Sequence, residues 1–393
     1  MAALSRALAA AACLCAASGL SLRADSGEQG NLSAGAASCA SLLDQGHIFM
    51  ADVVKDVGMG NYSGEVATAW HAYQDKLAQK LLSEHADGHR KKPFRTLVVS
   101  AVHDTDAMVE IFEINMNRLL ANSHGDKFDF ALFHIDSGVT EWKKHSWYRR
   151  STTFGGKVVM KTLGAGCKPQ FWAQITPKVA AKYDYIWMLD EDIRLDFLNW
   201  DFYRTVLSTI DPLVSQPVII PKEPFKRATG VTKLVMQAPH NDKFMIAYET
   251  QRSEVQAPVV STKIWPAVWE RNQNNDRRND WYIDDFWDVV AFLGENKCHK
   301  TGVLAVNAAP VRHMDCHNLF KGTKCVEGCG DSDANCRPVS KEEERLVVDG
   351  LKEAGCDVPA DWSAMCEGKE IHDCHTMLWE KSRRKSWTAE LFA

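Results

Sequence analysis

The sequence predicts an α/β fold with a mostly parallel central sheet flanked by helices. Between residues 93 and 320, short apolar runs typical of buried strands alternate with segments typical of amphipathic helices. Such alternation indicates right-handed strand–helix–strand crossovers and a largely parallel sheet. One apolar run, 183–189, ends directly in three acids, and ligands of open α/β sheets bind beyond the carboxyl ends of the strands. Neither a G-x-G-x-x-G fingerprint nor a P-loop occurs, which argues against a dinucleotide oxidoreductase and a P-loop ATPase.

Length and charge bound the class of protein. The chain has 393 residues, a formal net charge of -5 and 13 Trp. This length suits one large catalytic domain with appendages, and the charge is too small to suggest a nucleic-acid partner. Most of the Trp side chains are expected in the core, although several lie near the candidate site, where they would suit a sugar or nucleotide ligand.

The first 24 residues resemble a secretory leader. Arg6 supplies a positive charge and 7–22 is apolar, which is short of the roughly 20 apolar residues that a membrane span needs. We expect a cleaved signal peptide, with a short uncleaved signal anchor as the alternative. The chain would contact a membrane only in the second case. Either reading predicts the secretory pathway: the Golgi or ER lumen, or secretion.

Cysteine usage agrees with that compartment. Two of the 12 Cys lie in the leader, which leaves ten. An even number behind a leader predicts disulfides in an oxidising lumen, and no CxxC pair is present to suggest a zinc site. Two glycosylation sequons, at Asn31 and Asn61, point the same way.

Four regions are expected. After the leader, 25–92 is an N-terminal segment with one amphipathic helix over 64–84. The catalytic-type domain covers 93–320, and 321–393 is a disulfide-rich C-terminal extension with an amphipathic helix over 342–355.

Within the main domain, the expected strands are short runs rich in strand-favouring residues: 96–102, 129–136, 156–163, 183–189, 214–220, 254–260 and 302–314. The expected helices carry an apolar stripe: 107–121, 169–181, 199–209 and a segment that includes Trp265. The strand 214–220 is expected at a sheet edge, because Pro217 cannot donate to a ladder. Residues 221–250 are expected to form a polar loop.

The acids after 183–189 are the main candidate site. Side chains alternate along an extended chain, so Asp190 and Asp192 are expected to point the same way. Two carboxylates at the end of a strand form an oxygen-rich site that suits Mg²⁺ or Mn²⁺, with diphosphate oxygens completing the coordination. The alternative is a solvated acidic turn.

Two further groups are candidates. Asp284 and Asp285 lie near the start of an expected helix over 281–290, where the helix dipole alone would favour an acid. His313 stands at the end of the last strand, where a histidine is a ligand or an ordinary surface residue.

Several segments resemble the landmarks of a known family, and they occur in the same order. They are FALFHIDSGVTEW, KPQFW, KYDYIWMLDEDI, VSQPVI, EVQAPVVSTKIWPAVW and WYIDDFW. The family is a plant and algal domain of unknown function, labelled lysine-ketoglutarate reductase trans-splicing-related. The likeness covers roughly 96–317, and the family in turn resembles glycosyltransferases of the GT-A fold. The splicing label gains no support from the residues, since the sequence has no basic patch and no RNA-binding motif.

The resemblance implies a role for each candidate on the donor side. Asp190 and Asp192 match the D-x-D that binds Mn²⁺ or Mg²⁺ on a sugar nucleotide, and His313 matches a histidine that completes the metal shell. The residues that would bind the nucleotide sugar are Asp104, Asp136, Lys168 and Glu191. Asp104 and Asp136 follow the first two strands, where the nucleoside is held, and Lys168 would contact the diphosphate or brace the acids.

On the acceptor side, the resemblance implies that Asp284 or Asp285 deprotonates the hydroxyl of a glycan or glycoprotein. The paired acids leave the identity of this base open. Ile193 and Arg194 also depart from the family form, which has a small residue after the acids. The function implied is a lumenal, metal-dependent glycosyltransferase that uses a nucleotide-sugar donor. The alternatives are a non-catalytic carbohydrate-binding protein on the same fold and a metal-dependent hydrolase.

Overall fold

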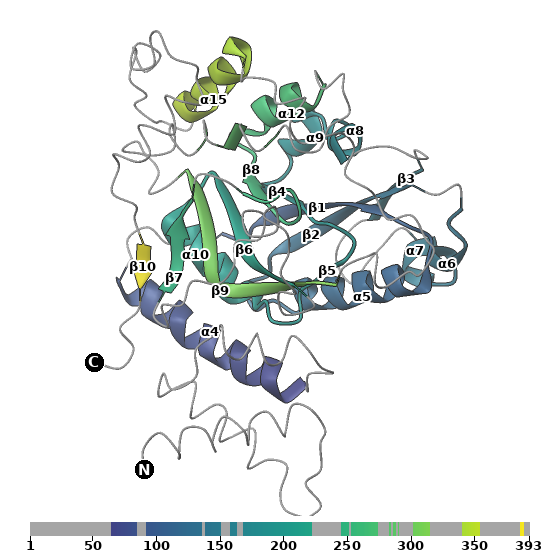
Figure 1. Cartoon of the computed structure of the whole chain (residues 1–393), viewed down its shortest axis with the longest axis horizontal. Coiled ribbons are helices and arrows are strands. Elements are labelled where there is room, and N and C mark those ends of the chain that lie inside the picture. The colour runs from purple at the N-terminus through teal and green to yellow at the C-terminus, as the bar shows by residue number, and fades with distance from the viewer. Residues whose placement is uncertain are drawn as a thin grey trace, which may run out of the picture.

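The computed structural model describes residues 64–84, 92–135, 138–150, 158–162, 168–221, 245–250, 253–273, 283, 286–287, 290, 302–314, 340–353 and 386–388. In this part of the chain, a ten-stranded sheet lies between two layers of helices (Figure 1). The leader, both sequons and all ten Cys that follow the leader lie outside the described residues.

The sheet has a parallel half and a mixed half. Its strands, in spatial order, are β10 (Ser386–Thr388), β7 (Met245–Glu249), β9 (Val303–His313), β6 (Val214–Pro221), β8 (Val259–Ser261), β4 (Tyr185–Met188), β1 (Arg95–Val102), β2 (Lys127–His134) and β3 (Val158–Thr162). The two-residue strand β5 (Ile193–Arg194) pairs with β9 outside this path. Strands β4, β1, β2 and β3 run parallel, as do β6 and β9, while β8, β7, β10 and β5 pair antiparallel. The predicted α/β class is confirmed.

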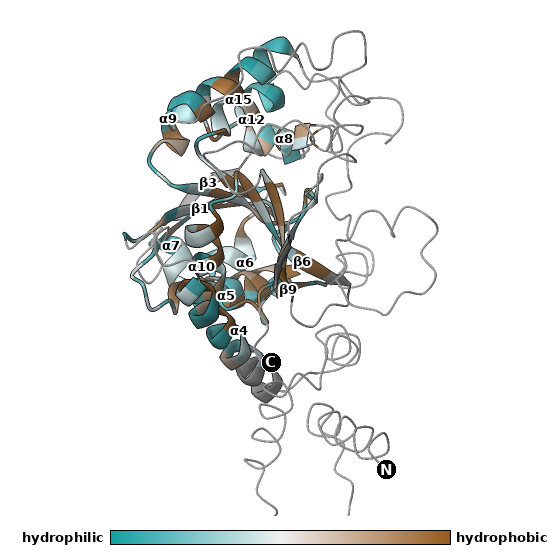
Figure 2. Ribbon diagram, turned by 90° about the vertical axis from the view of Figure 1, so that its left-hand side faces the viewer, coloured by the Kyte–Doolittle hydropathy of each residue, from teal (hydrophilic) through white to brown (hydrophobic). Residues whose placement is uncertain are grey.

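Helices cover both faces of the sheet. One layer holds α4 (Gly64–Glu84), α5 (Asp106–Leu120), α6 (Thr140–Lys143), α7 (Ser146–Arg149) and α10 (Trp200–Ile210). The other holds α8 (Lys168–Trp172), α9 (Pro177–Ala180), α12 (Trp265–Gln273) and α15 (Lys341–Glu353). Apolar colour is concentrated on the strands, and polar colour on the outer helices (Figure 2).

Neighbouring side chains of strands β1, β2 and β4 enter different cores. In β4, Trp187 packs with the α4, α5 and α10 layer, whereas Ile186 and Met188 pack with the α8, α9 and α12 layer. Because both faces are buried, such a strand is apolar at every position rather than at alternate ones. This explains the continuous apolar run that precedes the three acids.

One helix differs from the sequence prediction. The single helix expected over 169–181 is divided into α8 and α9, because Pro177 starts a new helix and Thr176 caps it by accepting a hydrogen bond from the Val179 amide. Proline lacks an amide hydrogen and is favoured in the first turn of a helix, so it marks a start here.

Two strand predictions were wrong. Strand β6 is not at an edge, since it lies between β9 and β8. The ladder with β9 shifts register between Pro217 and Ile219, and this irregularity accommodates the proline. Strand β7 occupies the end of the segment expected to be a loop, where Met245–Glu249 pairs with β9 and β10.

The helix predicted over 64–84 is confirmed as α4, and it docks through its apolar face and through polar contacts. Trp70, Leu77 and Leu81 are buried, and the Gln74 amide donates to the Ala308 carbonyl at 2.6 Å and accepts from the Asn199 amide at 3.0 Å. Helix α4 therefore packs against the sheet as part of the lower layer of helices (Figure 1). No helix within the described residues is both long and apolar enough to span a membrane.

Candidate functional site

The three acids form the turn that leaves the sheet after β4. The Leu189 amide donates to the Val99 carbonyl of β1 at 2.9 Å, and the Asp190 amide donates to the Gln256 carbonyl at 2.8 Å. Beyond Asp190 the chain turns, closed by a 3.2 Å hydrogen bond from the Ile193 amide to the Asp190 carbonyl. The acids thus lie at the carboxyl end of β4, where ligands of α/β sheets bind.

Asp190 is paired with a lysine from the first turn of α8. The Lys168 Nζ lies 2.6 Å from Asp190 Oδ2. Burial raises the pKa of Asp190 to about 6, and the neighbouring charge of Asp192 acts in the same direction. The positive charges of Lys168 and His313 oppose this rise. Besides burial, a second carboxylate, an ammonium and an imidazole therefore influence the pKa of Asp190. Such surroundings are expected for a site that binds charged groups.

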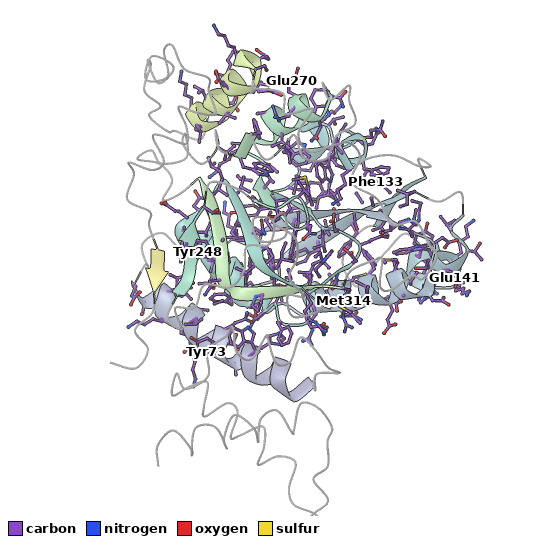
Figure 3. The ribbon with its side chains drawn as sticks, in the orientation of Figure 1. Tyr73, Phe133, Glu141, Tyr248, Glu270 and Met314 are labelled. Carbon is purple, nitrogen blue, oxygen red and sulfur yellow. The ribbon has the colours of Figure 1, made fainter. Side chains whose placement is uncertain are left out.

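Asp192 is paired with the predicted histidine. His313 Nε2 lies 3.1 Å from Asp192 Oδ2, and the Met314 amide donates to the Asp192 carbonyl at 2.8 Å. These residues meet because β5 and β9 form a short antiparallel ladder in which Ile193 pairs with His313. Met314, labelled in Figure 3, follows β9 where that strand reaches β5. Asp192 and His313 therefore lie side by side, and their role as metal ligands stays a prediction.

Glu191 is held inside the fold instead. Its carboxylate accepts from the His103 amide at 2.7 Å and lies 2.6 Å from His103 Nδ1. Burial raises the pKa of Glu191, and the contacts with His103 lower it. His103 is fixed in turn, since its carbonyl accepts from Trp142 Nε1 at 2.8 Å. The structure therefore gives Glu191 a bracing contact with the end of β1, and its predicted contact with a nucleotide sugar stays a prediction.

Asp104 binds main chain. Its two carboxylate oxygens accept from the Thr140 and Glu141 amides at 2.6 and 2.8 Å. A Cβ on Gly138 would lie 3.0 Å from Asp104 Oδ2, so the small residue permits this close approach. Asp104 thus holds the start of α6 against the end of β1, and its predicted contact with a nucleoside stays a prediction. The remaining candidates, Asp136, Asp284 and Asp285, lie outside the described residues.

The structure brings together Lys168, Asp190, Asp192 and His313. Within the described ranges, however, no three His, Cys, Asp or Glu side chains are close enough to count as a formed metal cluster. Two carboxylates and an imidazole are nevertheless a donor set that Mn²⁺ and Mg²⁺ accept. The residues therefore fit a metal held jointly with ligand oxygens.

Sequence reasoning missed two residues at this site. His103 directly follows the first expected strand, 96–102, and no sequence signal pairs it with Glu191. Asn115 was missed although a signal existed, because it stands in the apolar stripe of α5 with Phe112 and Leu119. A polar residue at such a position has a buried partner, since burial without a hydrogen bond is costly.

Comparison with solved structures finds glycosyltransferases. The chain is 11% identical to GalNAc-T7 with UDP, GalNAc and Mn²⁺, at a TM-score of 0.34, covering 57% of this chain and 44% of that one. It is 9% identical to a mannosyltransferase from Pyrobaculum calidifontis in complex with GDP-Man and Mn²⁺, at a TM-score of 0.37, covering 81% and 90%. It is 6% identical to S. aureus TarS 1-349, at a TM-score of 0.37, covering 71% and 76%.

These likenesses are too distant to assign a role to any residue of this chain, which spans less than half the length of GalNAc-T7. No curated protein matches the sequence. A family model, in contrast, matches residues 68–354 and so includes the whole site, α12 and α15. The chain belongs to that family, which is described as a protein of unknown function, DUF707.

Proposed function

We propose that the chain is a metal-dependent glycosyltransferase that moves a sugar from a nucleotide-sugar donor to a glycan or glycoprotein. The observation that carries this proposal is the pair Asp190 and Asp192, two residues apart at the end of a buried strand, with Lys168 at 2.6 Å from one and His313 at 3.1 Å from the other. The two carboxylates and the histidine suit a divalent metal, and the lysine suits the diphosphate bound to that metal. We further propose that it acts in the lumen of the secretory pathway.

The charge of each residue would determine its role at the site. Asp190, Asp192 and His313 would hold Mn²⁺ or Mg²⁺, which when bound stabilises the charge that develops on the leaving diphosphate. Lys168 would turn from Asp190 to a diphosphate oxygen once the carboxylate binds the cation. The Glu191–His103 contact would keep the turn in place, and the Glu191 carboxylate would not contribute its charge to the ligand site. Asp284 or Asp285 would accept the proton of the acceptor hydroxyl.

One observation favours a non-catalytic carbohydrate-binding protein as the second candidate. The Lys168 ammonium already neutralises Asp190 at 2.6 Å, and His313 already contacts Asp192. A protein that binds sugars without a metal could keep such closed pairs as structure. The two candidates differ in turnover: only the first releases a nucleoside diphosphate.

The test is a turnover assay on the purified protein with a panel of UDP- and GDP-sugars, Mn²⁺ and mixed glycoprotein acceptors. Released UDP or GDP is measured. We expect release by the parent, and at least about a hundredfold less from Asp190→Asn or Asp192→Asn. The matched control is Asp211→Asn. Asp211 is also paired with a lysine, Lys263 at 3.0 Å, but it follows α10, and asparagine tolerates its positive φ of 51°. No release from folded parent, or equal release from the site variants, would contradict the proposal.

A further inference from the structure

Asn115 of α5 joins the helix to the chain just beyond the three acids. Its Nδ2 donates to the Ile193 carbonyl at 2.7 Å, and its Oδ1 accepts from the Leu195 amide at 2.9 Å. The side chain is buried, with 4% of the residue exposed. Both partners belong to the segment that begins with Asp192, so one side chain grips the main chain within one residue of a candidate metal ligand.

Asn115 makes the two hydrogen bonds that a neighbouring strand would otherwise make. In an extended segment, the carbonyl of one residue and the amide of the second residue after it lie on the same edge. The other edge of β5 is taken by β9, since Ile193 pairs with His313 and the Met314 amide donates to the Asp192 carbonyl at 2.8 Å. The Asn115 carboxamide donates one hydrogen bond and accepts another at the spacing of these two main-chain groups, so it takes the place of a strand on the free edge.

The position of Asn115 in its helix points to the same role. Its neighbours on the buried face of α5 include Met108, Phe112 and Leu119, and it is the polar residue in that stripe. Asparagine is a poor helix former and is costly to bury without partners. An apolar residue would serve the packing better, so the two main-chain bonds explain why a carboxamide stands there.

The segment needs such support. Beyond the Asp190 amide the chain is no longer part of β4, and β5 is only two residues long. A short two-stranded ladder is marginal by itself. The position of Asp192 relative to Asp190 therefore depends on β9 on one edge and on Asn115 on the other.

We propose that Asn115 is a positioning residue for the Asp190–Asp192 site: it fixes the segment after the turn so that the two carboxylates stay at the spacing that one divalent cation requires. This inference rests on the proposed metal-dependent function. It adds a residue that touches neither the metal nor the nucleotide and acts only through the main chain of Ile193 and Leu195.

The test uses Asn115→Asp, which keeps the shape and the acceptor for the Leu195 amide and cannot, when ionised, donate to the Ile193 carbonyl. A second variant, Asn115→Ser, removes the donor reach without adding charge and serves if the first does not fold. The matched control is Asn122→Asp. Asn122 follows the same helix and also bonds main chain with both atoms of its amide, donating to Leu119 and Asp126 carbonyls at 3.0 and 3.1 Å and accepting from the Asp126 amide at 2.9 Å.

Two quantities are measured on folded protein well below its unfolding temperature. The first is the Kd for Mn²⁺ by calorimetry. The second is hydrogen exchange of peptides that cover residues 190–196 in metal-free protein. We expect Asn115→Asp or Asn115→Ser to weaken Mn²⁺ binding at least about tenfold, as loss of a residue that orients a ligand does, and to speed exchange in 190–196. Asn122→Asp should do neither.

The outcomes separate this inference from the function on which it rests. If the parent binds Mn²⁺ and the Asn115 variants bind it equally well with unchanged exchange, the positioning role is refuted and the metal site stands. If the parent does not bind Mn²⁺, the proposed function fails. Exchange then decides the role of Asn115: faster exchange in 190–196, confined to the Asn115 variants, supports it, and unchanged exchange overturns it.

Discussion

The main-chain amide and the ring of His103 hold both carboxylate oxygens of Glu191, at 2.7 and 2.6 Å. Only 5% of the His103 side chain and 6% of the Glu191 side chain are exposed. Glu191 lies between Asp190 and Asp192 in sequence, so this contact fastens the middle of the turn to the end of β1. Asp190 and Asp192, on either side of Glu191, instead contact Lys168 and His313 respectively.

Replacing one member of this pair should destabilise the protein. His103→Leu leaves the Glu191 carboxylate buried without the imidazole, and removing one partner of a buried pair costs about 3 kcal/mol. The double variant His103→Leu/Glu191→Leu should be less destabilised than His103→Leu alone, because no charge is then buried unpaired. Urea unfolding of the parent, both single variants and the double variant measures the coupling. A double variant as unstable as the sum of the single variants would show that the two side chains do not interact.

A methyl group on Gly350 should loosen the contact between α15 and the start of α12. A Cβ at this position would collide with the main-chain carbonyl oxygen of Lys263. Glycine to alanine inside an exposed helix normally stabilises it by about 1 kcal/mol. Here we expect Gly350→Ala to lower the free energy of unfolding by about 2 kcal/mol instead, since overpacking against main chain cannot be relieved by a rotamer change. A thermal melt decides between the two signs, and an unchanged or raised melting temperature would contradict the packing.

Glu344 should make stability fall as pH rises. Burial raises its pKa to about 7 from an ordinary value near 4.5; the charge of Glu343 also raises it and Lys341 opposes it. In the unfolded chain Glu344 ionises near pH 4.5, whereas in the folded chain it keeps its proton to about pH 7. The unfolded state therefore binds fewer protons in this interval, and the penalty grows from pH 4.5 to pH 7 and stays constant above.

Glu344→Gln removes that penalty, because glutamine stays neutral. We expect the variant to be more stable than the parent by about 2 kcal/mol at pH 8, and equal to it at pH 4. Urea unfolding at both pH values measures the difference. Glu342→Gln is the control: Glu342 is exposed on the same turn and pairs with Arg345, which lowers its pKa, so its replacement should give no gain at pH 8. A gain at both pH values for Glu344→Gln would contradict the titration.

The elements that sequence predicted well are those whose signal is local. The run before Asp190 is apolar because β4 is buried on both faces, and the stripe of α5 follows the helical period. Register and neighbours are not local. Pro217 predicted an edge strand, yet β6 is internal. A register shift in the β6–β9 ladder accommodates the proline there. Strand β7 was missed because its five residues gain their stability from β9 and β10 rather than from their own pattern.

At the site, the resemblance implied that Asp190, Asp192 and His313 share a metal ion, and the structure places the Asp192 and His313 side chains 3.1 Å apart. The contacts of Glu191 and Asp104 could not be foreseen. Both acids bond main-chain amides, of His103 for the first and of Thr140 and Glu141 for the second. Every residue except proline has such an amide, so the sequence does not show which one an acid will find.

The most direct measurement is calorimetric titration of the purified protein with UDP and with GDP, each with and without Mn²⁺. The parent is compared with Asp190→Ala/Asp192→Ala and with the Asp211→Asn control. The proposed function predicts that one nucleotide binds only when Mn²⁺ is present, that the double variant weakens this binding at least about a hundredfold, and that the control binds like the parent. Nucleotide binding that is independent of Mn²⁺ and of both acids would contradict it, as would the absence of binding by folded parent protein.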